Sequence, residues 1–500
     1  FSSIGYTTLE EPVNGREKID IKLFMQAEAL DQVMVVAFGT AKKSTFTGSA
    51  AVINEEAFSL RPITEVSQAL TATTPGVQVG TSNGQPGSEP TIRIRGIGSF
   101  NASNAPLIVL DGMPYDNAFS SINPNDIESV TVLKDASSAS LYGARGANGV
   151  LLINTKKGKI GKPKVVVKYN LGLTSQQSAD YKLLGDKDYM ELYWEMHRNT
   201  FLLNGYSEAN ANALAGPALI AGLGYNPYLM DGSELFDSNG KLNPNARNHW
   251  AEDTDWYGAV TQLGKRHDTN ISISGANENT DYYTSVGYMK EEGYIIGSEF
   301  ERISAKANAN SKITSWLKMG TNLNVSHSTS GGEQNETSGS NANPFRFVRY
   351  IGNIFPIHFH NPATGEYIYD SNGNKMYDFG NGWESEDGTI VISGRDAFAG
   401  NNHALEVHNI YNGYLRQTIN IKGYAEATLA KGLRLTINAG LGSNMYRSWS
   451  GGFVYEQKGN AGTSAKNISN TTTWTYQQLL NYQINKGKHH FDALAGHESY

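Results

Sequence analysis

The chain has 500 residues, a mild formal net charge of −7 and no cysteine. It therefore has neither a disulfide framework nor a thiolate metal site, and its basic residues form no patch that would bind nucleic acid. No apolar run reaches the roughly 20 residues of a membrane-spanning helix, which excludes a helical inner-membrane protein but leaves a membrane β-barrel open.

Residues 1–25 contain short strand-like segments. Ile19, Ile21 and Leu23 alternate with polar residues, as in a half-buried strand. We interpret the segment as the end of a small β-sandwich whose front is missing. Because the chain begins at Phe1 rather than Met and stops within a predicted strand, we expect it to be cut at both ends.

A short apolar strand is predicted within residues 26–43, in "ALDQVMVVAFGTAKK". Val33–Phe38 is β-branched and aromatic, and it is too short to span a membrane as a helix. The residues alone are compatible with an ordinary edge strand. They leave open what this strand pairs with.

Residues 44–160 form a compact mixed α/β unit by prediction. "TEVSQALTATTPGVQV" predicts a helix with Thr64 as its N-cap, ending near Pro75. "TIRIRGIGS" and "APLIVLDGMPY" predict strands, and the second strand ends in a turn at Asp111-Gly112.

From Pro163 onwards apolar and polar residues alternate, as in "VVVKYNLGLT" and "RISAKANAN". We expect roughly nine antiparallel strands of about 10 residues, with long irregular segments at about 176–262 and 328–405. Short turns on one side and long loops on the other are typical of outer-membrane barrels, although a soluble β-sandwich alternates too. The Asn- and Ser-rich polar faces favour a barrel with a wet lumen. Because a barrel has no open edge, this one is incomplete as given.

Two sequence patterns are considered as phosphate or calcium sites, and neither is predicted to be one. Gly143, Gly146 and Gly149 match neither the Rossmann nor the Walker pattern, so we predict a tight turn. "DSNG" at Asp237 and at Asp370 does not complete a calcium loop, so both are predicted to be turns.

His358 and His360 share one strand face, where they are able to bind metal. No carboxylate or third histidine lies at a convincing spacing, so we predict surface or lumen histidines. No Ser-His-Asp triad or carboxylate pair is evident. We therefore predict no enzyme activity, no cofactor and no bound metal.

Several phrases in the observed order resemble the SusC-like TonB-linked outer-membrane transporters of Bacteroidota. They are "ALDQVMVVAFGTAKK", "TPGVQV", "TIRIRG", "PLIVLDGMP", "NPNDIESVTVLKDASSASLYGARGANGVLLINTKKGK" and "NISISGANENTDYYTSVGYMKEEGYI". The resemblance implies a mostly β fold, with an N-terminal mixed α/β plug inside a transmembrane antiparallel β-barrel of the 22-stranded class. Only the first part of that barrel is present.

The resemblance also implies a domain layout. Residues 1–25 correspond to the end of a carboxypeptidase-regulatory-like β-sandwich, residues 26–43 to the TonB-box segment and linker, and residues 44–160 to the plug. Residues 161–500 correspond to the N-terminal part of the barrel with its long extracellular loops.

The TonB box itself corresponds to Leu30, Asp31, Gln32, Val33, Met34, Val35 and Val36. An extended strand on a tether is able to add to the sheet edge of TonB through main-chain hydrogen bonds. The departures from the family pattern are small: Ala37-Phe38-Gly39 replaces the usual Gly-Tyr-Gly, and Gln32 replaces a common Glu.

The implied function is TonB-dependent import of a glycan or oligopeptide across a Gram-negative outer membrane. The implied partners are TonB with its inner-membrane complex, a SusD-type surface lipoprotein acting as a lid, and outer-membrane lipids. One alternative is a lidless TonB-dependent receptor for a siderophore or vitamin. Another is a surface adhesin or glycan-binding protein without transport.

Three arginines lie in the plug segments that match the family best: Arg93, Arg95 and Arg145. We hypothesise that they bind carboxylates on the barrel wall or within the plug and lock the plug in place. The alternative is that they only cap plug turns.

The long loops are rich in aromatic residues that are able to stack on sugars or peptide side chains, but aromatic residues also form interfacial girdles. The residues concerned are Trp250, Trp256, Tyr257, Tyr367 and Tyr369. No substrate-binding residue is assigned.

Overall fold

The computed structural model describes residues 21, 33–36, 39–42, 50–56, 63, 65–71, 74–80, 84–135, 139–176, 183–332, 343–395, 398–452, 462–487 and 489–500. The predicted β-sandwich end therefore lies outside the described residues, apart from Ile21. Among the helices in these ranges, none has both the length and the apolar character needed to cross a membrane.

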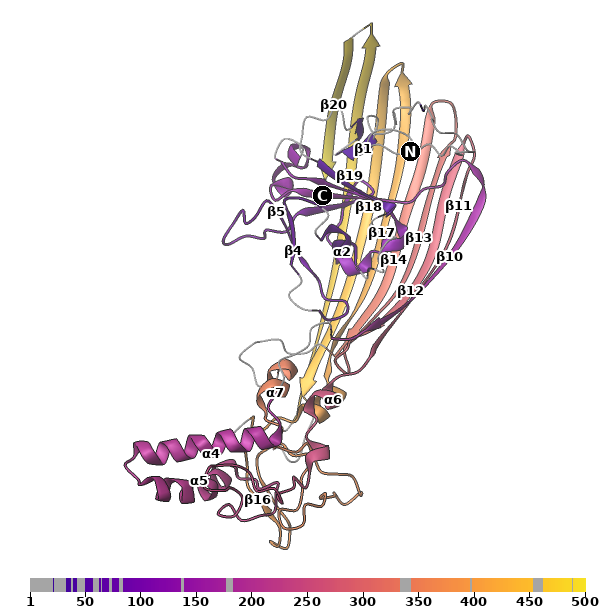
Figure 1. Cartoon of the computed structure of the whole chain (residues 1–500). Helices are drawn as coiled ribbons and strands as arrows, with labels where there is room; N and C mark the ends of the chain where they lie inside the picture. The colour runs from indigo at the N-terminus through magenta and orange to yellow at the C-terminus, as the bar shows by residue number, and fades with distance from the viewer. Residues whose placement is uncertain are drawn as a thin grey trace, which may run out of the picture.

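A curved antiparallel sheet of nine strands dominates the fold (Figure 1). The strand order follows the sequence, and within the described residues the first and last strands are not joined to each other. The strands are β10 (Gly161–Thr174), β11 (Gly264–Ala276), β12 (Thr280–Glu292), β13 (Glu299–Lys312), β14 (Leu317–Gly331), β17 (Tyr411–Ala430), β18 (Leu433–Gly452), β19 (Thr463–Lys486) and β20 (His489–Ser499). Their lengths of 11 to 24 residues exceed the predicted length of about 10.

The two faces of this sheet differ as the alternation predicts. On β13, Ile303 is 46% exposed on the outer face, whereas Ser304, Lys306 and Asn308 are buried on the inner face. The predicted polar inner face is therefore present, and its polar groups are covered by protein rather than by water.

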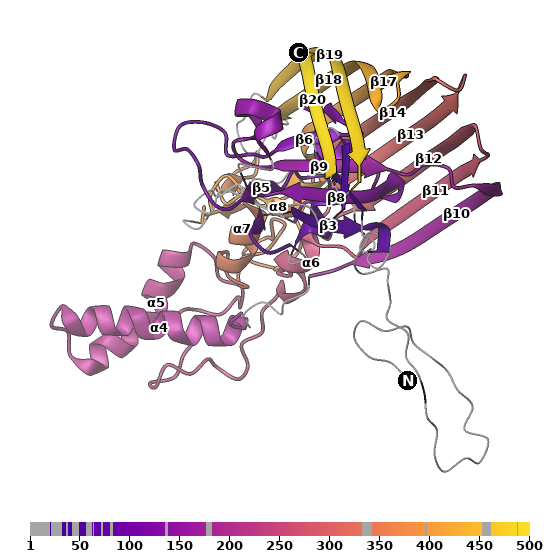
Figure 2. The same ribbon diagram turned by 90° about the horizontal axis from the view of Figure 1, so that it is seen from above.

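The plug covers that inner face (Figure 2). Its sheet has the order β3-β8-β9-β6-β7, in which only β6 and β9 are parallel. The strands are β3 (Ala50–Asn54), β6 (Leu107–Leu110), β7 (Met113–Pro114), β8 (Ile127–Leu133) and β9 (Val150–Thr155), and β4 (Val77–Gly80) and β5 (Thr91–Ile94) form a separate hairpin. Short 3₁₀ turns are η2 (Phe119–Ser121), η3 (Pro124–Asp126) and η4 (Ser140–Gly146).

The plug has its own apolar core, built from β8, β9 and the short helix α2 (Val66–Leu70). This helix is shorter than predicted, and Glu65 rather than Thr64 is its N-cap. Thr64 itself lies outside the described residues. The predicted tight turn at the spaced glycines is present, because Gly143 and Gly149 have φ values of +59° and +88° around η4.

The described parts of the two long connections are folded, which corrects the prediction of irregular segments. They contain α4 (Asp186–Leu203), α5 (Glu208–Leu223), η5 (Ala251–Asp253), α6 (Trp256–Val260), α7 (Pro344–Tyr350), β15 (Trp383–Glu384), β16 (Val391–Ile392), α8 (His403–Glu406) and η6 (Val407–Asn409). Local signals were present: Ser207 caps α5 by accepting from the Asn210 amide, and Asn343 precedes Pro344 at the start of α7.

These elements gather at one end of the sheet (Figure 1). We call the described residues within 183–263 and 343–410 the loop cap. At the opposite end the strands are joined by short connections at residues 277–279, 313–316, 431–432 and 487–488. The predicted asymmetry between short turns and long loops is therefore confirmed.

Candidate plug–sheet interface and loop cap

The predicted TonB-binding segment is only partly described. Val33–Val36 forms β1, which pairs antiparallel with β2 (Gly39–Lys42), from Val33 opposite Lys42 to Val36 opposite Gly39. The hairpin lies close to β8 of the plug. Leu30, Asp31 and Gln32 lie outside the described residues, so TonB binding by residues 30–36 stays a prediction.

The three predicted lock arginines have different contacts. Arg145 forms an ion pair with Glu498 of β20, and its guanidinium lies 4.7 Å from the centre of the Tyr500 ring. Arg93 and Arg95 lie on and just after β5, and in the described part of the chain neither forms an ion pair. The lock through these three residues stays a prediction.

Other charged contacts between plug and sheet have the opposite polarity, with the cation on the sheet. Arg416 of β17 lies 2.9 Å from the Glu89 carboxylate of the plug. Glu89 also accepts hydrogen bonds from the Ser120 hydroxyl at 2.7 Å and the Phe119 amide at 3.2 Å. Sequence reasoning missed this contact because nothing in the strand pattern says which inward cation meets which plug carboxylate.

Buried arginines of the sheet also bind neutral plug groups. Arg302 of β13 donates to the carbonyls of Ser120 and Ile122 at 2.8 and 3.2 Å. Arg266 of β11 donates to the carbonyl of Ile63 at 2.7 Å. These plug–sheet contacts are polar, and water is able to replace each of these bonds once the plug moves.

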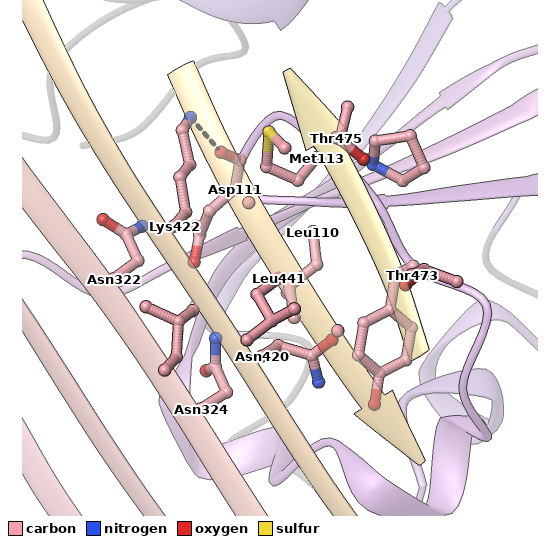
Figure 3. A pocket seen from close by; sticks show the side chains of 15 residues that line it. Leu110, Asp111, Met113, Asn322, Asn324, Asn420, Lys422, Leu441, Thr473 and Thr475 are labelled. Carbon is pink, nitrogen blue, oxygen red and sulfur yellow. Dashed lines mark hydrogen bonds between the residues drawn. The ribbon is translucent and has the colours of Figure 1, made fainter. Parts of the chain in front are cut away.

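A plug turn next to β6 meets the sheet at a small polar cavity, drawn in Figure 3. Lys422 donates to the Asp111 carbonyl at 2.7 Å, and Lys306 lies 3.3 Å from the Asp111 carboxylate. The cavity of about 30 Å³ is large enough to hold water. Its polar lining comes from plug and sheet: Asp111, Asn322, Asn324, Asn420, Lys422, Thr473 and Thr475.

In the loop cap, one carboxylate joins the two long connections. Asp253 from the first connection lies 2.8 Å from His358 Nδ1 and 3.0 Å from His360 Nε2 in the second. This corrects the prediction that no carboxylate serves these histidines, because Asp253 is 105 residues from His358. Burial by itself would raise the pKa of Asp253, but hydrogen bonds from both histidines outweigh it and lower that pKa to about 2.

His360 contacts two segments of the loop cap. Its Nδ1 lies 2.9 Å from the Gly365 carbonyl, while its Nε2 faces the Asp253 carboxylate. The described residues contain no group of three or more His, Asp or Glu arranged to hold a metal ion.

A second buried network joins the same two connections. Asp378 and Arg395 form an ion pair at 3.1 Å with both side chains fully buried. Tyr225 donates to Asp378 at 2.6 Å, and Arg395 also donates to the Asn401 carbonyl at 2.7 Å. The two long connections are thus tied into one unit.

Two aromatic residues considered for substrate stacking are core residues instead. Trp250 and Trp256 are 4% and 2% exposed, and their indoles donate to the carbonyls of Ile354 and Phe355. Tyr257 and Tyr369 remain exposed. The predicted turns at "DSNG" are present: Asp237 and Asp370 each accept main-chain amides two and four residues later.

Comparison with known proteins shows which proteins the chain resembles. Residues 42–150 match the family model "TonB-dependent Receptor Plug Domain". The chain is 33% identical over 331 residues to TonB-dependent receptor P26 of Formosa agariphila, and 34% identical over 316 residues to TonB-dependent receptor SusC of Bacteroides thetaiotaomicron. These alignments cover 65% and 61% of this chain, but only 30% and 27% of the relatives.

Among solved structures, the RagAB peptide importer in its "open-open" state aligns with 93% of this chain and 48% of that chain, with a TM-score of 0.67 and 26% identity. The resemblance to the SusC-like TonB-dependent transporters is confirmed. So are the mostly β fold with a plug and the location in a Gram-negative outer membrane. The relatives' names describe receptors and an importer, which fits a protein that is not an enzyme.

The chain spans about a third of the length of the curated relatives and about half of the RagAB chain that it matches. The family model starts near the predicted plug boundary at residue 44 and ends before residue 160. The division into residues 1–25, 26–43, 44–160 and 161–500 stays a prediction.

Proposed function

We propose that the protein to which this chain belongs imports a nutrient across the outer membrane, driven by TonB. The observation that carries the proposal is a plug on the polar face of a membrane-type sheet, joined to it by many hydrogen bonds and ion pairs. Such a plug is able to move as a body, because water replaces its partners without exposure of its apolar core.

Energy has to reach this plug from outside, because the outer membrane has no ATP of its own. The proposed route is main-chain pairing between TonB and the segment Leu30–Val36. Val33–Val36 is already extended in β1, which supports strand addition as the mode of binding. Either the free edge of β1 accepts TonB, or the hairpin with β2 opens.

A SusD-type lipoprotein lid is the proposed extracellular partner. The loop cap supports this proposal, because one apolar core from both long connections makes it a rigid platform rather than a set of independent loops. The proposed substrate is a glycan or oligopeptide, in line with the relatives named SusC and RagAB peptide importer.

The test compares two substitutions at one position of β1 in the full-length protein, using the purified periplasmic domain of TonB as the probe. Val35→Pro removes a main-chain donor and should abolish binding of that domain. Val35→Thr keeps the main chain and β-propensity and should retain binding. Equal binding by both variants, with both proteins inserted in the membrane, contradicts the proposed route.

A further inference from the structure

Two lysines of the sheet converge on Asp111 of the plug, one at its buried carboxylate and one at its carbonyl. It follows β6 in a tight turn, with φ values of +50° at Asp111 and +85° at Gly112. Aspartate tolerates this left-handed backbone better than most residues. The turn carries the Asp111 side chain and carbonyl directly to the sheet (Figure 3).

Hydrogen bonds within the plug hold the Asp111 carboxylate in position for this contact. Thr155 of β9 donates to Asp111 twice, from its amide to Oδ1 at 2.9 Å and from its hydroxyl to Oδ2 at 2.7 Å. The Asp111 amide in turn donates to the Ile153 carbonyl at 2.9 Å. Because three bonds hold Asp111 to β9, a force on Asp111 is transmitted to the whole plug sheet.

The sheet supplies one lysine for each acceptor. Lys306 of β13 lies 3.3 Å from Oδ2, and Lys422 of β17 donates to the carbonyl at 2.7 Å. Strand β14 separates the two lysine-bearing strands. A single plug residue therefore bridges three neighbouring strands of the sheet.

The Asp111–Lys306 pair is also more deeply buried than the other plug–sheet ion pairs of the described residues. Its side chains are 7% and 2% exposed, compared with 40% and 15% for Glu89 and Arg416. Separation of a buried pair leaves uncompensated charges unless water arrives at once. The polar cavity beside Asp111 and Lys422 gives water its place of entry.

We propose that Asp111, Lys306 and Lys422 form the latch of the plug, a two-point contact that must break before the plug leaves the sheet. This inference rests on the proposed import function, because only a plug that moves needs a latch. Asp111 acts as a positioning residue: it touches no substrate, and it sets the closed position of the plug. The latch is thus opposite in polarity to the arginine lock expected from the sequence.

The test measures how often the plug leaves the sheet when neither TonB nor substrate is present. Ser328 of β14 is fully buried, and its hydroxyl has no hydrogen-bond partner among the described residues, so Ser328→Cys is a mild change. The chain has no other cysteine. Ser328 is paired with Arg302 on one side and Arg416 on the other, and both arginines contact Ser120 of the plug. In the full-length protein in lipid bilayers, the rate of maleimide labelling at this thiol then reports plug departure.

Lys306→Met and Asp111→Asn should each speed labelling by about tenfold or more. Lys422→Met should have a smaller effect, because it removes a single hydrogen bond. The double variant Lys306→Met/Asp111→Asn should label no faster than the faster of these two single variants, because both changes remove the same ion pair. Lys290→Met is the matched control, since Lys290 pairs with Glu292 and Glu299 of the sheet itself.

The latch is overturned if Lys306→Met and Asp111→Asn label no faster than Lys290→Met, or if their effects simply add in the double variant. If Lys306→Met fails to insert, Asp111→Asn alone decides, because asparagine accepts the left-handed turn. The labelling experiment does not need TonB, so its outcome is independent of the TonB-binding test. If the latch variants label faster but the protein does not bind TonB, the latch stands and only the proposed import is overturned.

Discussion

The plug–sheet interface and the loop cap are both large contacts between segments distant in sequence, but they are built in different ways. The interface includes polar bonds from Arg266, Arg302, Arg416 and two lysines to plug carbonyls and carboxylates. The loop cap has an apolar core with fully buried residues such as Phe347.

The difference has a functional meaning. Replacing a polar protein contact by contacts with water costs a modest net free energy. Opening an apolar core costs more, because its whole apolar area becomes exposed to water. We therefore expect the plug to leave as a unit while the cap keeps its fold. The predictions below are ordered from the largest expected effect to the smallest.

The largest effect is expected when a buried ion pair inside the loop cap is removed. Arg395→Met leaves the fully buried Asp378 without its cationic partner and should destabilise the cap by about 3–5 kcal/mol. Hydrogen exchange of the cap amides measures this loss. Arg198→Met, which removes an ion pair with the 73% exposed Glu208, is the matched control and should change little. A uniform loss in plug and cap would mean that they are one cooperative unit.

The plug should be more stable in acid, owing to Glu65. Burial raises the pKa of this carboxyl to about 8, with the nearby Glu89 adding to the effect. A raised pKa means that the folded plug holds a proton that the unfolded chain releases, so stability falls as pH rises from about 4 towards about 8. The urea midpoint of plug unfolding at about pH 5 and about pH 8 measures this slope. Glu65→Gln should flatten it, and an unchanged slope in that variant would refute the assignment.

The cap should respond to pH in the opposite direction. The pKa of Asp253 is lowered to about 2, so its contribution is complete above the ordinary carboxyl pKa and is lost as pH falls from about 4 through about 2. Fluorescence of the buried tryptophans of the cap reports this loss. Asp253→Asn should remove this acid transition, whereas Asp188→Asn on the exposed face of α4 should leave it in place. An acid transition that survives Asp253→Asn would contradict the role of this carboxylate.

The smallest effect is expected at the exposed end of the interface. Arg416→Met breaks the ion pair with Glu89, which is 40% exposed. The free energy that holds the plug on the sheet should therefore fall by no more than about 1 kcal/mol. Thiol labelling at Ser328→Cys should therefore rise only a few-fold. An effect as large as that of Lys306→Met would place the main contact at Glu89 rather than at Asp111.

Much of this fold is predictable from the sequence because a period of two is a local signal. The alternation around Ile303 indicates both the strand and its polar inner face. The helices of the loop cap were missed, although Ser207 and Asn343 are ordinary N-caps, because the apolar residues of α5 lie all round the helix and give little period.

The candidate site was less predictable, because its contacts join residues far apart in the sequence. Arg93, Arg95 and Arg145 were chosen for their place in plug motifs, while Lys306 is one cation in the alanine and asparagine run "AKANAN". Only the register of β13 against the plug shows that this lysine meets Asp111. Asp253 escaped notice beside His358 for the same reason.

The most direct test of the account is hydrogen exchange of the full-length protein in lipid bilayers, with and without the periplasmic domain of TonB. The account predicts faster exchange in the plug strands β6, β8 and β9 when that domain binds, with the loop cap unchanged. Exchange that rises equally in the cap, or that does not rise in the plug although TonB is bound, would contradict a plug that leaves a stable cap behind.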